Sequence, residues 1–293
     1  MRSASENTSK VLIEALPYIQ KFQGKTLVIK YGGAAMVDEG LKQSVAEDLA
    51  LMHTVGINTV VVHGGGPEIS AAMKKMGKQA TFVNGLRVTD KETMEITEMV
   101  LVGKINQQIV GYLNGRGTLA VGLSGKDASL LRAKKHSGRS LKGGKAADLG
   151  YVGEVSQVNS AILLSLLKEG FMPIIAPTGY GQDGHAYNCN ADSVAGAVAA
   201  ALKAEKLILL TDQVGLLKDV AKPQSLIPTL KVREIAKLVR QGVIDKGMLP
   251  KMEACQLAVG SGVAKAHIID GRVAHSLLLE VFTDRGIGTE ITL

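Results

Sequence analysis

Six short apolar runs recur along this 293-residue sequence and constrain its fold more than any other feature. The runs are rich in Val, Ile and Leu and almost uninterrupted by polar residues, as expected for strands that are buried on both faces. They are TLVIK (26–30), TVVVH (59–63), TLAVGL (118–123), MPIIAP (172–177), KLILLT (206–211) and KAHIID (265–270). Such runs predict a parallel sheet covered by helices.

Segments with helical periodicity separate these runs, so the fold class should be α/β. We expect a three-layer αβα sandwich with a mostly parallel, open sheet. Short alternating runs over 151–158 and 180–188 predict antiparallel hairpins added to that sheet. The expected helices cover 41–52, 90–113, 159–168, 192–203, 231–241 and 251–259.

An apolar stripe at helical spacing precedes the first strand, over residues 5–23. It predicts an N-terminal helical extension, which Pro17 should kink or interrupt because proline lacks the amide donor of the helix ladder. The stripe could pack on its own subunit or pair with another subunit, and periodicity does not distinguish the two.

Composition narrows the classes of function. The net charge of +7 suits nucleic acid or small anionic ligands, but only 3% of residues are aromatic, which argues against base stacking on single strands. The basic segment 132–145 is rich in Gly and Ser and predicts a solvated loop. Cys189 and Cys255 are too far apart for a metal knuckle and are interpreted as buried thiols of a cytoplasmic protein. No signal peptide or membrane-spanning run is expected.

Three consecutive glycines follow the second strand, in TVVVHGGGPEIS (59–70). Such a run costs backbone entropy on folding, so we expect it to have a structural or functional reason. A P-loop is excluded by spacing, and the dinucleotide-like GRGTLA (115–120) follows a helix and enters a strand, the reverse of the required order. An esterase oxyanion loop requires a Gly-x-Ser-x-Gly elbow, which the sequence lacks.

An anion-binding edge remains as the interpretation of these glycines. A second glycine turn, in VIKYGGAAM (28–36), ends the first strand, and the carboxyl ends of neighbouring parallel strands form the ligand-binding edge of α/β sheets. The helix that opens after Gly66 presents free amides to an anion. Lys30, at the end of the first strand, is placed to reach a phosphate.

Further motifs occur with the order and spacing of one known family. They are KYGGAAM, VVVHGGGPEI, NGLRVTD, MEITEMVLVGKIN, NCNADSVAGAVAAAL, LILLTDQVGLL, MLPKMEAC and HIIDGR. Over residues 8–293 the chain resembles the amino-acid kinase superfamily, and within it the acetylglutamate kinases. The segments NGLRVTD and YNCNAD separate it from the carbamate, aspartate, glutamate and uridylate kinases of that superfamily.

The resemblance implies transfer of a phosphoryl group from MgATP to the γ-carboxylate of N-acetyl-L-glutamate, the second step of arginine synthesis. Lys30 and Lys251 match the two lysines that flank the transferred group, and Asp192 matches the carboxylate that orients both. An N-cap of the following helix is the alternative interpretation of Asp192. Mg²⁺ should be held mainly by the nucleotide, because no cluster of acidic ligands is visible.

The resemblance also assigns binding residues. Substrate contacts are expected from Gly65, Gly66, Arg87 and Asn188. ATP contacts are expected from Gly32, Gly33, Asp212, Gly215 and Gly247. The segment 243–251 should close over the phosphates, and Lys246 stands there where relatives carry a glycine-richer run.

Regulation and assembly follow from the same resemblance. Relatives with an N-terminal helix tend to be arginine-inhibited hexamers, built as trimers of dimers, so arginine feedback is expected, with His275, Glu280 and Gly288 near the effector.

We divide the chain into an extension (1–24), an acyl-amino-acid lobe (25–190) and a nucleotide lobe (191–293). Some photosynthetic relatives bind a PII signalling protein, but no such surface is evident. Another carboxylate kinase, or a catalytically inactive arginine or acylglutamate sensor, remains an alternative; nucleic-acid and membrane partners are not expected.

Overall fold

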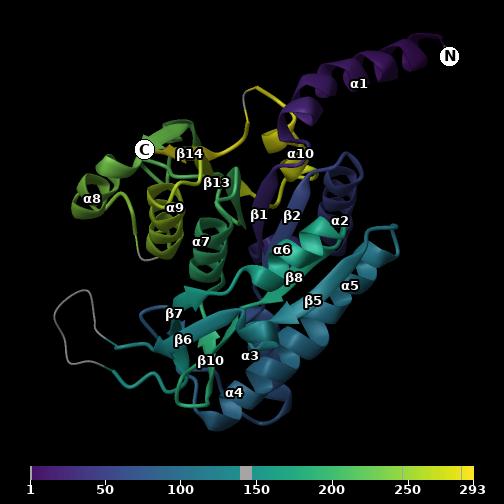
Figure 1. The fold of residues 1–293 in the computed structure, drawn as a ribbon. Helices are drawn as coiled ribbons and strands as arrows, with labels where there is room; N and C mark the ends of the chain where they lie inside the picture. The colour runs from purple at the N-terminus through teal and green to yellow at the C-terminus, as the bar shows by residue number, and fades with distance from the viewer. Residues whose placement is uncertain (1, 139–146, 246, 285) are drawn as a thin grey trace.

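The computed structural model describes residues 2–138, 147–245, 247–284 and 286–293. Lys246 and residues 139–145 of the basic segment lie outside the described residues. A single eight-stranded sheet crosses the molecule in the order β12-β14-β13-β11-β1-β2-β8-β5 (Figure 1). The strands are β1 (Thr26–Tyr31), β2 (Asn58–His63), β5 (Ala120–Ser124), β8 (Met172–Ala176), β11 (Lys206–Thr211), β12 (Thr229–Lys231), β13 (Lys265–Asp270) and β14 (Thr289–Thr292).

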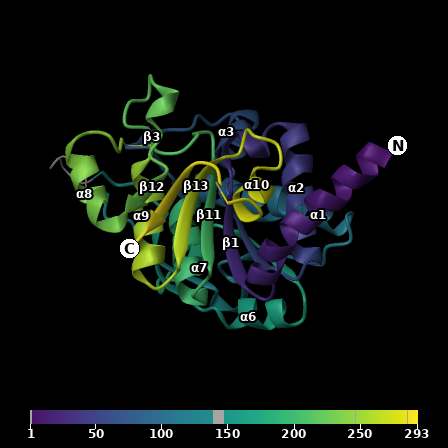
Figure 2. The ribbon, with the colours of Figure 1, turned by 90° about the horizontal axis from the view of Figure 1, so that it is seen from above.

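The sheet is parallel except at one side, where β14 runs antiparallel to β13. All six predicted apolar runs form strands of this sheet. Figure 2 shows β13, β11 and β1 side by side, as their pairing registers require. Because β1 pairs with β11 on one side and with β2 on the other, one sheet crosses the boundary between the two predicted lobes. The division into lobes stays a prediction.

Helices cover both faces of the sheet, which confirms the αβα sandwich. One face carries α6 (Ala161–Lys168), α7 (Ala191–Leu202), α8 (Val232–Arg240) and α9 (Leu249–Gly260). The other face carries α2 (Glu39–Thr54), α3 (Gly66–Lys75), α4 (Lys91–Glu98), α5 (Gln107–Asn114) and α10 (Ser276–Val281).

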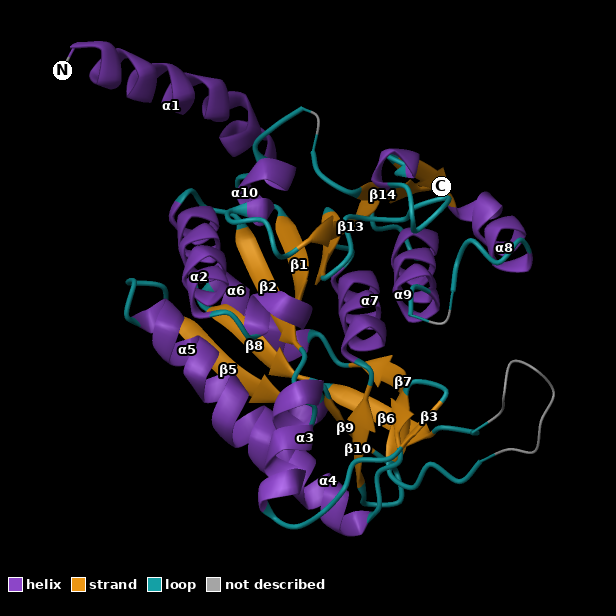
Figure 3. Ribbon diagram, turned by 180° about the vertical axis from the view of Figure 1, so that it is seen from behind, coloured by secondary structure: helices purple, strands orange, loops and turns teal. Residues whose placement is uncertain are grey.

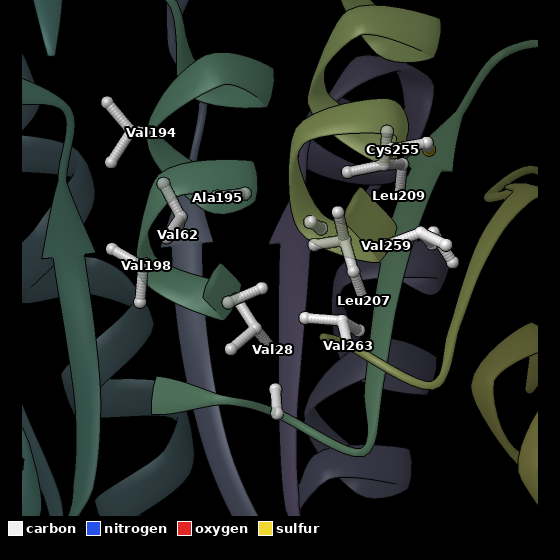
Figure 4. Packing of buried hydrophobic residues seen from close by; sticks show 14 of the residues in the cluster. Val28, Val62, Val194, Ala195, Val198, Leu207, Leu209, Cys255, Val259 and Val263 are labelled. Atoms are coloured by element: carbon white, nitrogen blue, oxygen red, sulfur yellow. The ribbon is translucent and has the colours of Figure 1, made fainter. Parts of the chain in front are cut away.

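Successive side chains of β1 point to opposite faces of the sheet, so this strand packs against both helical layers. Leu27 and Ile29 enter the core under α2, whereas Val28 enters the core under α7 and α9. Figure 4 shows Val28 beside Val198 of α7 and Leu207 of β11, within that second core. Lys30 follows two residues after Val28 and therefore points to the same side, toward α7.

The predicted long helix over 90–113 forms, but its centre differs from an α-helix. Residues Met99–Asn106 form a π-helix between α4 and α5. π-helical segments are rare and often mark functional positions, since the extra residue per turn redirects side chains. Hydrophobic periodicity does not reveal such a segment because the buried face continues through it.

The hairpins expected over 151–158 and 180–188 do not join the main sheet, so that prediction was wrong. Strands β6 (Leu131–Lys135), β7 (Val152–Val158), β9 (Thr178–Tyr180) and β10 (Ala186–Cys189) close into a small barrel of their own (Figure 3). The start of the segment predicted to be a solvated loop is therefore a strand. There Ala133 is buried and the guanidinium of Arg132 lies over the Tyr180 ring.

The N-terminal extension is a helix, α1 (Arg2–Phe22), which continues through Pro17 without interruption. Its first turns project away from the sandwich (Figures 1 and 3). Phe22 anchors its end in the core, but Val11, Leu12 and Ile13 are 57–68% exposed. This projecting helix packs little of its apolar stripe on its own subunit.

Candidate active site

A cleft of about 750 Å³ opens at the carboxyl ends of β1 and β2, between these strands, the small barrel and the start of α9. Both predicted glycine turns line it. Gly64, Gly65 and Gly66 follow β2 and lead into α3, whose first turn contains Pro67. Because β1 and β2 are paired in register, the two turns lie at the same edge, as predicted.

Lys30 and Asp192 form the charged centre of this cleft. The Lys30 Nζ lies 3.1 Å from Asp192 Oδ1, and both side chains are at least nine-tenths buried. Gly32 makes this position possible, since a Cβ there would lie 2.5 Å from the Lys30 Nζ. With a side chain at position 32, the end of Lys30 would have to move from the place where it contacts Asp192.

Lys251 reaches the same carboxylate from α9. Its Nζ donates to Asp192 Oδ2 over 3.1 Å, beside the cleft-lining residues Leu249 and Pro250. Two ammonium groups from distant parts of the sequence thus share one carboxylate. Burial alone would raise the pKa of Asp192, but the two lysine charges hold it below its ordinary value, so Asp192 is ionised at neutral pH.

The N-cap interpretation of Asp192 is wrong. The N-cap of α7 is Asn190, whose Oδ1 accepts from the amides of Asp192 and Ser193. Asn190 therefore ties the first turn of α7 and leaves the Asp192 carboxylate free to face the lysines. We did not predict Asn190 as the N-cap from the sequence. An Asn directly before a helix with an acidic residue in its first turn is nevertheless a recognisable capping signal.

Arg87 lies in β4 (Leu86–Arg87), which pairs with β3 (Phe82–Val83). Its guanidinium donates to Gly66 O (2.7 Å) and Ser70 Oγ (2.8 Å), and it lies 4.7 Å from the centre of the Phe82 ring. These contacts place a buried cation at the cleft, beside the glycine turn that follows β2. Burial lowers the pKa of Arg87 from its ordinary value.

Asn188, in β10, the last strand of the barrel before α7, also lines the cleft. Its Nδ2 donates to Thr89 Oγ1 over 3.4 Å, a long bond, so the amide keeps capacity for another partner. The barrel supplies two further polar cleft residues that sequence reasoning missed, His136 and Glu154. No local motif marks them, because their strands were not predicted or were assigned to the main sheet.

The predicted nucleotide residues are only partly brought together. Gly32 and Gly33 line the cleft, and the backbone amide of Asp212 lies against Gly33. Gly215 and Gly247 are not among the residues that line it. Gly215 adopts φ +134° and packs against Leu226 and Thr289, where a side chain would not fit.

The three predicted effector residues lie apart from the cleft and have different neighbours. His275 Nδ1 contacts Asp48 Oδ1 at 2.6 Å, and its amide donates to Ser44. Glu280 is buried beside Lys206 and His267, at 3.2 and 2.7 Å. Gly288 packs on the backbone at Ile268 and Gly215.

No group of three or more His, Cys, Asp or Glu side chains in the described ranges could hold a metal ion. None of the described helices is long and apolar enough to cross a membrane. Cys189 and Cys255 are both free and buried, as predicted.

Comparison with known proteins gives concordant matches. The family model "Amino acid kinase family" matches residues 25–270. Similar curated proteins include the acetylglutamate kinases of Syntrophus aciditrophicus (55% identity; 97% of each chain) and Pelotomaculum thermopropionicum (56%; 96% of each). Among solved structures, N-acetylglutamate synthase from Neisseria gonorrhoeae, complexed with coenzyme A and N-acetyl-glutamate, matches with a TM-score of 0.82 and 27% identity.

The match to the synthase covers 97% of this chain but 63% of the synthase chain. The curated kinases, in contrast, match over nearly their whole length. The cleft lined by Lys30 and Asp192, the bond of Lys251 to the same carboxylate, the three-layer sandwich and these matches agree. The chain belongs to the amino acid kinase family.

Proposed function

We propose that this protein transfers the γ-phosphoryl group of ATP to the γ-carboxylate of N-acetyl-L-glutamate, which yields N-acetyl-L-glutamyl 5-phosphate for arginine biosynthesis. Relatives that carry the name acetylglutamate kinase, at about 55% identity over nearly the whole chain, support this activity. The observation that carries the proposal is the buried carboxylate of Asp192, 3.1 Å from each of the Lys30 and Lys251 ammonium groups, at a cleft edged by two glycine turns.

The chemistry explains why two cations are needed. A carboxylate with an ordinary pKa of about 4.3 is already ionised at neutral pH, so the acceptor requires no general base. The barrier comes from bringing this anion up to a polyphosphate and from the charge spread over the transferring group. Lys30 and Lys251 supply positive charge on opposite sides of that group, a contribution of about 3 kcal/mol for one well-placed donor in a water-poor site.

Asp192 acts as a positioning residue in this scheme. With no substrate bound, its carboxylate compensates both ammonium groups and holds them near each other. As phosphate oxygens enter the cleft, they offer the lysines a second set of anionic partners. Asp192 Oδ1 contacts the Lys30 ammonium group at 3.1 Å, and Asp192 Oδ2 accepts from Lys251, so each carboxylate oxygen holds one lysine.

The acyl-amino acid is proposed to bind on the β2 side of the cleft. The amides of Gly65 and Gly66, at the start of α3, are proposed to donate to it, since the helix dipole favours an anion there. Arg87 is proposed to bind the α-carboxylate, since a planar guanidinium matches a carboxylate geometrically, and Asn188 is proposed to bind the acylamino end of the substrate.

ATP is proposed to bind on the β1 and β11 side. Gly32 and Gly33 allow close approach of phosphates, and Asp212 follows β11 next to Gly33. Gly215 and Gly247 remain proposed contacts of a closed state. Mg²⁺, held mainly by phosphate oxygens, would neutralise part of the nucleotide charge.

Arginine feedback and a hexameric assembly are also proposed, together with a cytoplasmic location. The exposed apolar side chains of α1 fit pairing with the same helix of another subunit. Near the end of the sandwich that carries α1, Glu280 offers a buried carboxylate for a guanidinium, but Lys206 and His267 occupy it in this structure. Arginine would therefore have to displace or join these partners.

Two alternatives lead to a direct test. Another carboxylate kinase would prefer a different acceptor, and a catalytically inactive sensor would bind ligands without turnover. Hydroxylamine trapping of the acyl phosphate, with N-acetylglutamate, glutamate, aspartate and carbamate as acceptors, distinguishes them. We expect product with N-acetylglutamate, less with added arginine, and none with Lys30→Ala. Turnover with another acceptor alone, or with none, would refute the proposal.

A further inference from the structure

Two polar residues lie buried directly behind the glycine turn that follows β2 (Gly64–Gly66) and have no role in the chemistry described so far. His63, the last residue of β2, has no exposed surface, and Asn106, the last residue of the π-helix, is 1% exposed. Asn106 Nδ2 lies 2.8 Å from the carbonyl oxygen of Ile174 and 3.2 Å from His63 Nε2. The other ring nitrogen, His63 Nδ1, lies 2.8 Å from the carbonyl oxygen of Gly64.

The carbonyl oxygens at the two ends of these contacts determine which atom donates in each hydrogen bond. A carbonyl oxygen only accepts, so the Asn106 atom that faces Ile174 must be the amide nitrogen, which only donates. The same nitrogen faces His63 Nε2, which must therefore accept. The ring proton then sits on Nδ1 and is donated to Gly64. Burial lowers the pKa of His63 to about 4, so the ring is neutral at physiological pH, as this arrangement requires.

The last bond of the chain acts on the amide that follows Gly64. The Gly64 carbonyl and the Gly65 N–H belong to one planar peptide unit, so a bond that holds the oxygen also sets the direction of the N–H. The π-helix also contacts Gly65 directly, through two apolar side chains. A Cβ at Gly65 would lie 2.6 Å from Leu101 Cδ2 and 2.4 Å from Ile105 Cδ1, so both side chains press on the residue.

Gly122 in strand β5 provides the space that the Asn106 side chain occupies. Gly122 of β5 pairs with Ile174 of β8, and a Cβ at Gly122 would lie 2.0 Å from Asn106 Oδ1. A strand interior disfavours glycine unless a close approach requires it. The glycine in β5, the π-helical turn and the directed hydrogen bonds are three separate features that serve the same contact.

We propose that Asn106 and His63 are positioning residues, which orient the Gly65 amide and thereby set the affinity of the cleft for the acyl-amino acid. This inference rests on the proposed function, because the Gly65 amide is a substrate contact only in that function. It assigns to the π-helix the task of supporting the substrate side of the cleft, while the nucleotide side is left unaffected.

The test compares Asn106→Leu, His63→Leu and His63→Asn in steady-state kinetics with each substrate varied. We expect both leucine variants to raise the KM for N-acetylglutamate about tenfold or more, because a directed donor is lost, with the KM for ATP changed less than about twofold. Asn places its amide nitrogen close to the position of Nδ1, so His63→Asn should recover most of the loss. The double leucine variant should be no worse than His63→Leu alone.

Two further variants separate positioning from general damage. Gly122→Ala keeps both polar side chains but fills the space of Asn106, and it should also raise the KM for N-acetylglutamate. Asn114→Leu, on the same helical run, loses only its bonds to Ala120 and should leave both KM values unchanged. The inference would be overturned if the KM values for N-acetylglutamate and ATP rose equally. It would also be overturned if the effects of the two leucine substitutions added in the double variant, or if His63→Asn did not recover the KM for N-acetylglutamate.

A measurement on the wild-type protein keeps the inference falsifiable if variants fail to fold. Nitrogen-15 shifts of the His63 ring identify the protonated nitrogen, and we expect the Nδ1–H tautomer. The Nε2–H tautomer would overturn the hydrogen-bond chain. A wild-type protein without turnover of N-acetylglutamate would refute the proposed function, whereas the tautomer would still decide whether the chain orients the Gly65 peptide unit.

Discussion

Replacing Asp192 by Asn should destabilise the free protein strongly and slow phosphoryl transfer. The carboxylate is 5% exposed and lies 3.1 Å from each of two lysine nitrogens, so the variant leaves two buried ammonium groups without a counter-charge. At an effective dielectric constant of about 20, each contact is worth about 5 kcal/mol before desolvation is subtracted. Loss of one partner of a buried ion pair costs about 3–5 kcal/mol net, and we expect a loss in this range.

Thermal unfolding and kinetics measure the two consequences. For a chain of this size the loss corresponds to a Tm lower by about 5–15 °C. A non-hydrolysable ATP analogue should narrow the gap, because phosphate oxygens replace the missing carboxylate as partners of Lys30 and Lys251. The kcat should fall by about a hundredfold or more, since the lysines lose their orientation while the acceptor sites are intact.

The pH dependence gives an independent check. The pKa of Asp192 in the folded protein is below its ordinary value of 3.8, so its stabilising effect is full above that value and disappears as pH falls through the folded-state pKa. The difference between wild type and Asp192→Asn should therefore shrink below about pH 4.

A surface pair supplies the control for Asp192→Asn. Asp148 contacts Lys135 at 2.9 Å, but both side chains are more than half exposed, so Asp148→Asn should change the stability by less than about 1 kcal/mol. An Asp192→Asn variant with a Tm and kcat like those of the wild type would show that Asp192 neither compensates nor orients the lysines.

Three further substitutions or deletions test other parts of the molecule. Arg87→Ala should raise the KM for N-acetylglutamate about a hundredfold with little change in the KM for ATP, because a charged hydrogen-bonding group is lost from one side of the cleft; an unchanged KM in initial-rate assays would contradict the role. Deletion of residues 1–23 should convert hexamers to dimers and abolish arginine inhibition, as measured by light scattering and inhibition curves, and an inhibited hexamer would contradict both proposals. Burial raises the pKa of Asp48 to about 6, so this carboxyl favours the folded state less as pH rises from about 4 to 6. The stability of Asp48→Asn relative to wild type, from urea unfolding, should therefore increase over that interval, and a decrease would contradict the direction of the shift.

The layered architecture was predictable because its signals are local. A strand buried on both faces requires a continuous apolar run, and all six such runs became strands of the main sheet. Lys30 and the two glycine turns could be placed at one edge for the same reason, since the carboxyl ends of neighbouring parallel strands must meet there. The roles of Arg87, Asn188 and Lys251 came from resemblance to a family, because their spacing in the sequence carries no geometry.

The small barrel was not predictable. Alternating runs marked the segments of β7, β9 and β10, but no local signal showed that β7 would pair with β6 and β10 and not with the main sheet. The interruption of α1 that we expected at Pro17 does not occur, because Pro17 lies on an exposed part of the helix and removes a single amide donor from it.

Local periodicity and backbone preference in the amino-acid sequence were sufficient to set the strands of the main sheet, most of the helices that cover it and the edge at which the two glycine turns meet. Resemblance to the family led us to expect Asp192 beside Lys30 and Lys251, but only the packed molecule gave the 3.1 Å contacts and their burial, and only it showed that Asn106 reaches His63 beside Gly122. These contacts join residues far apart in the chain. Their energies depend on burial and on the direction of each hydrogen bond, and both arise only when the helical layers are in place on the sheet.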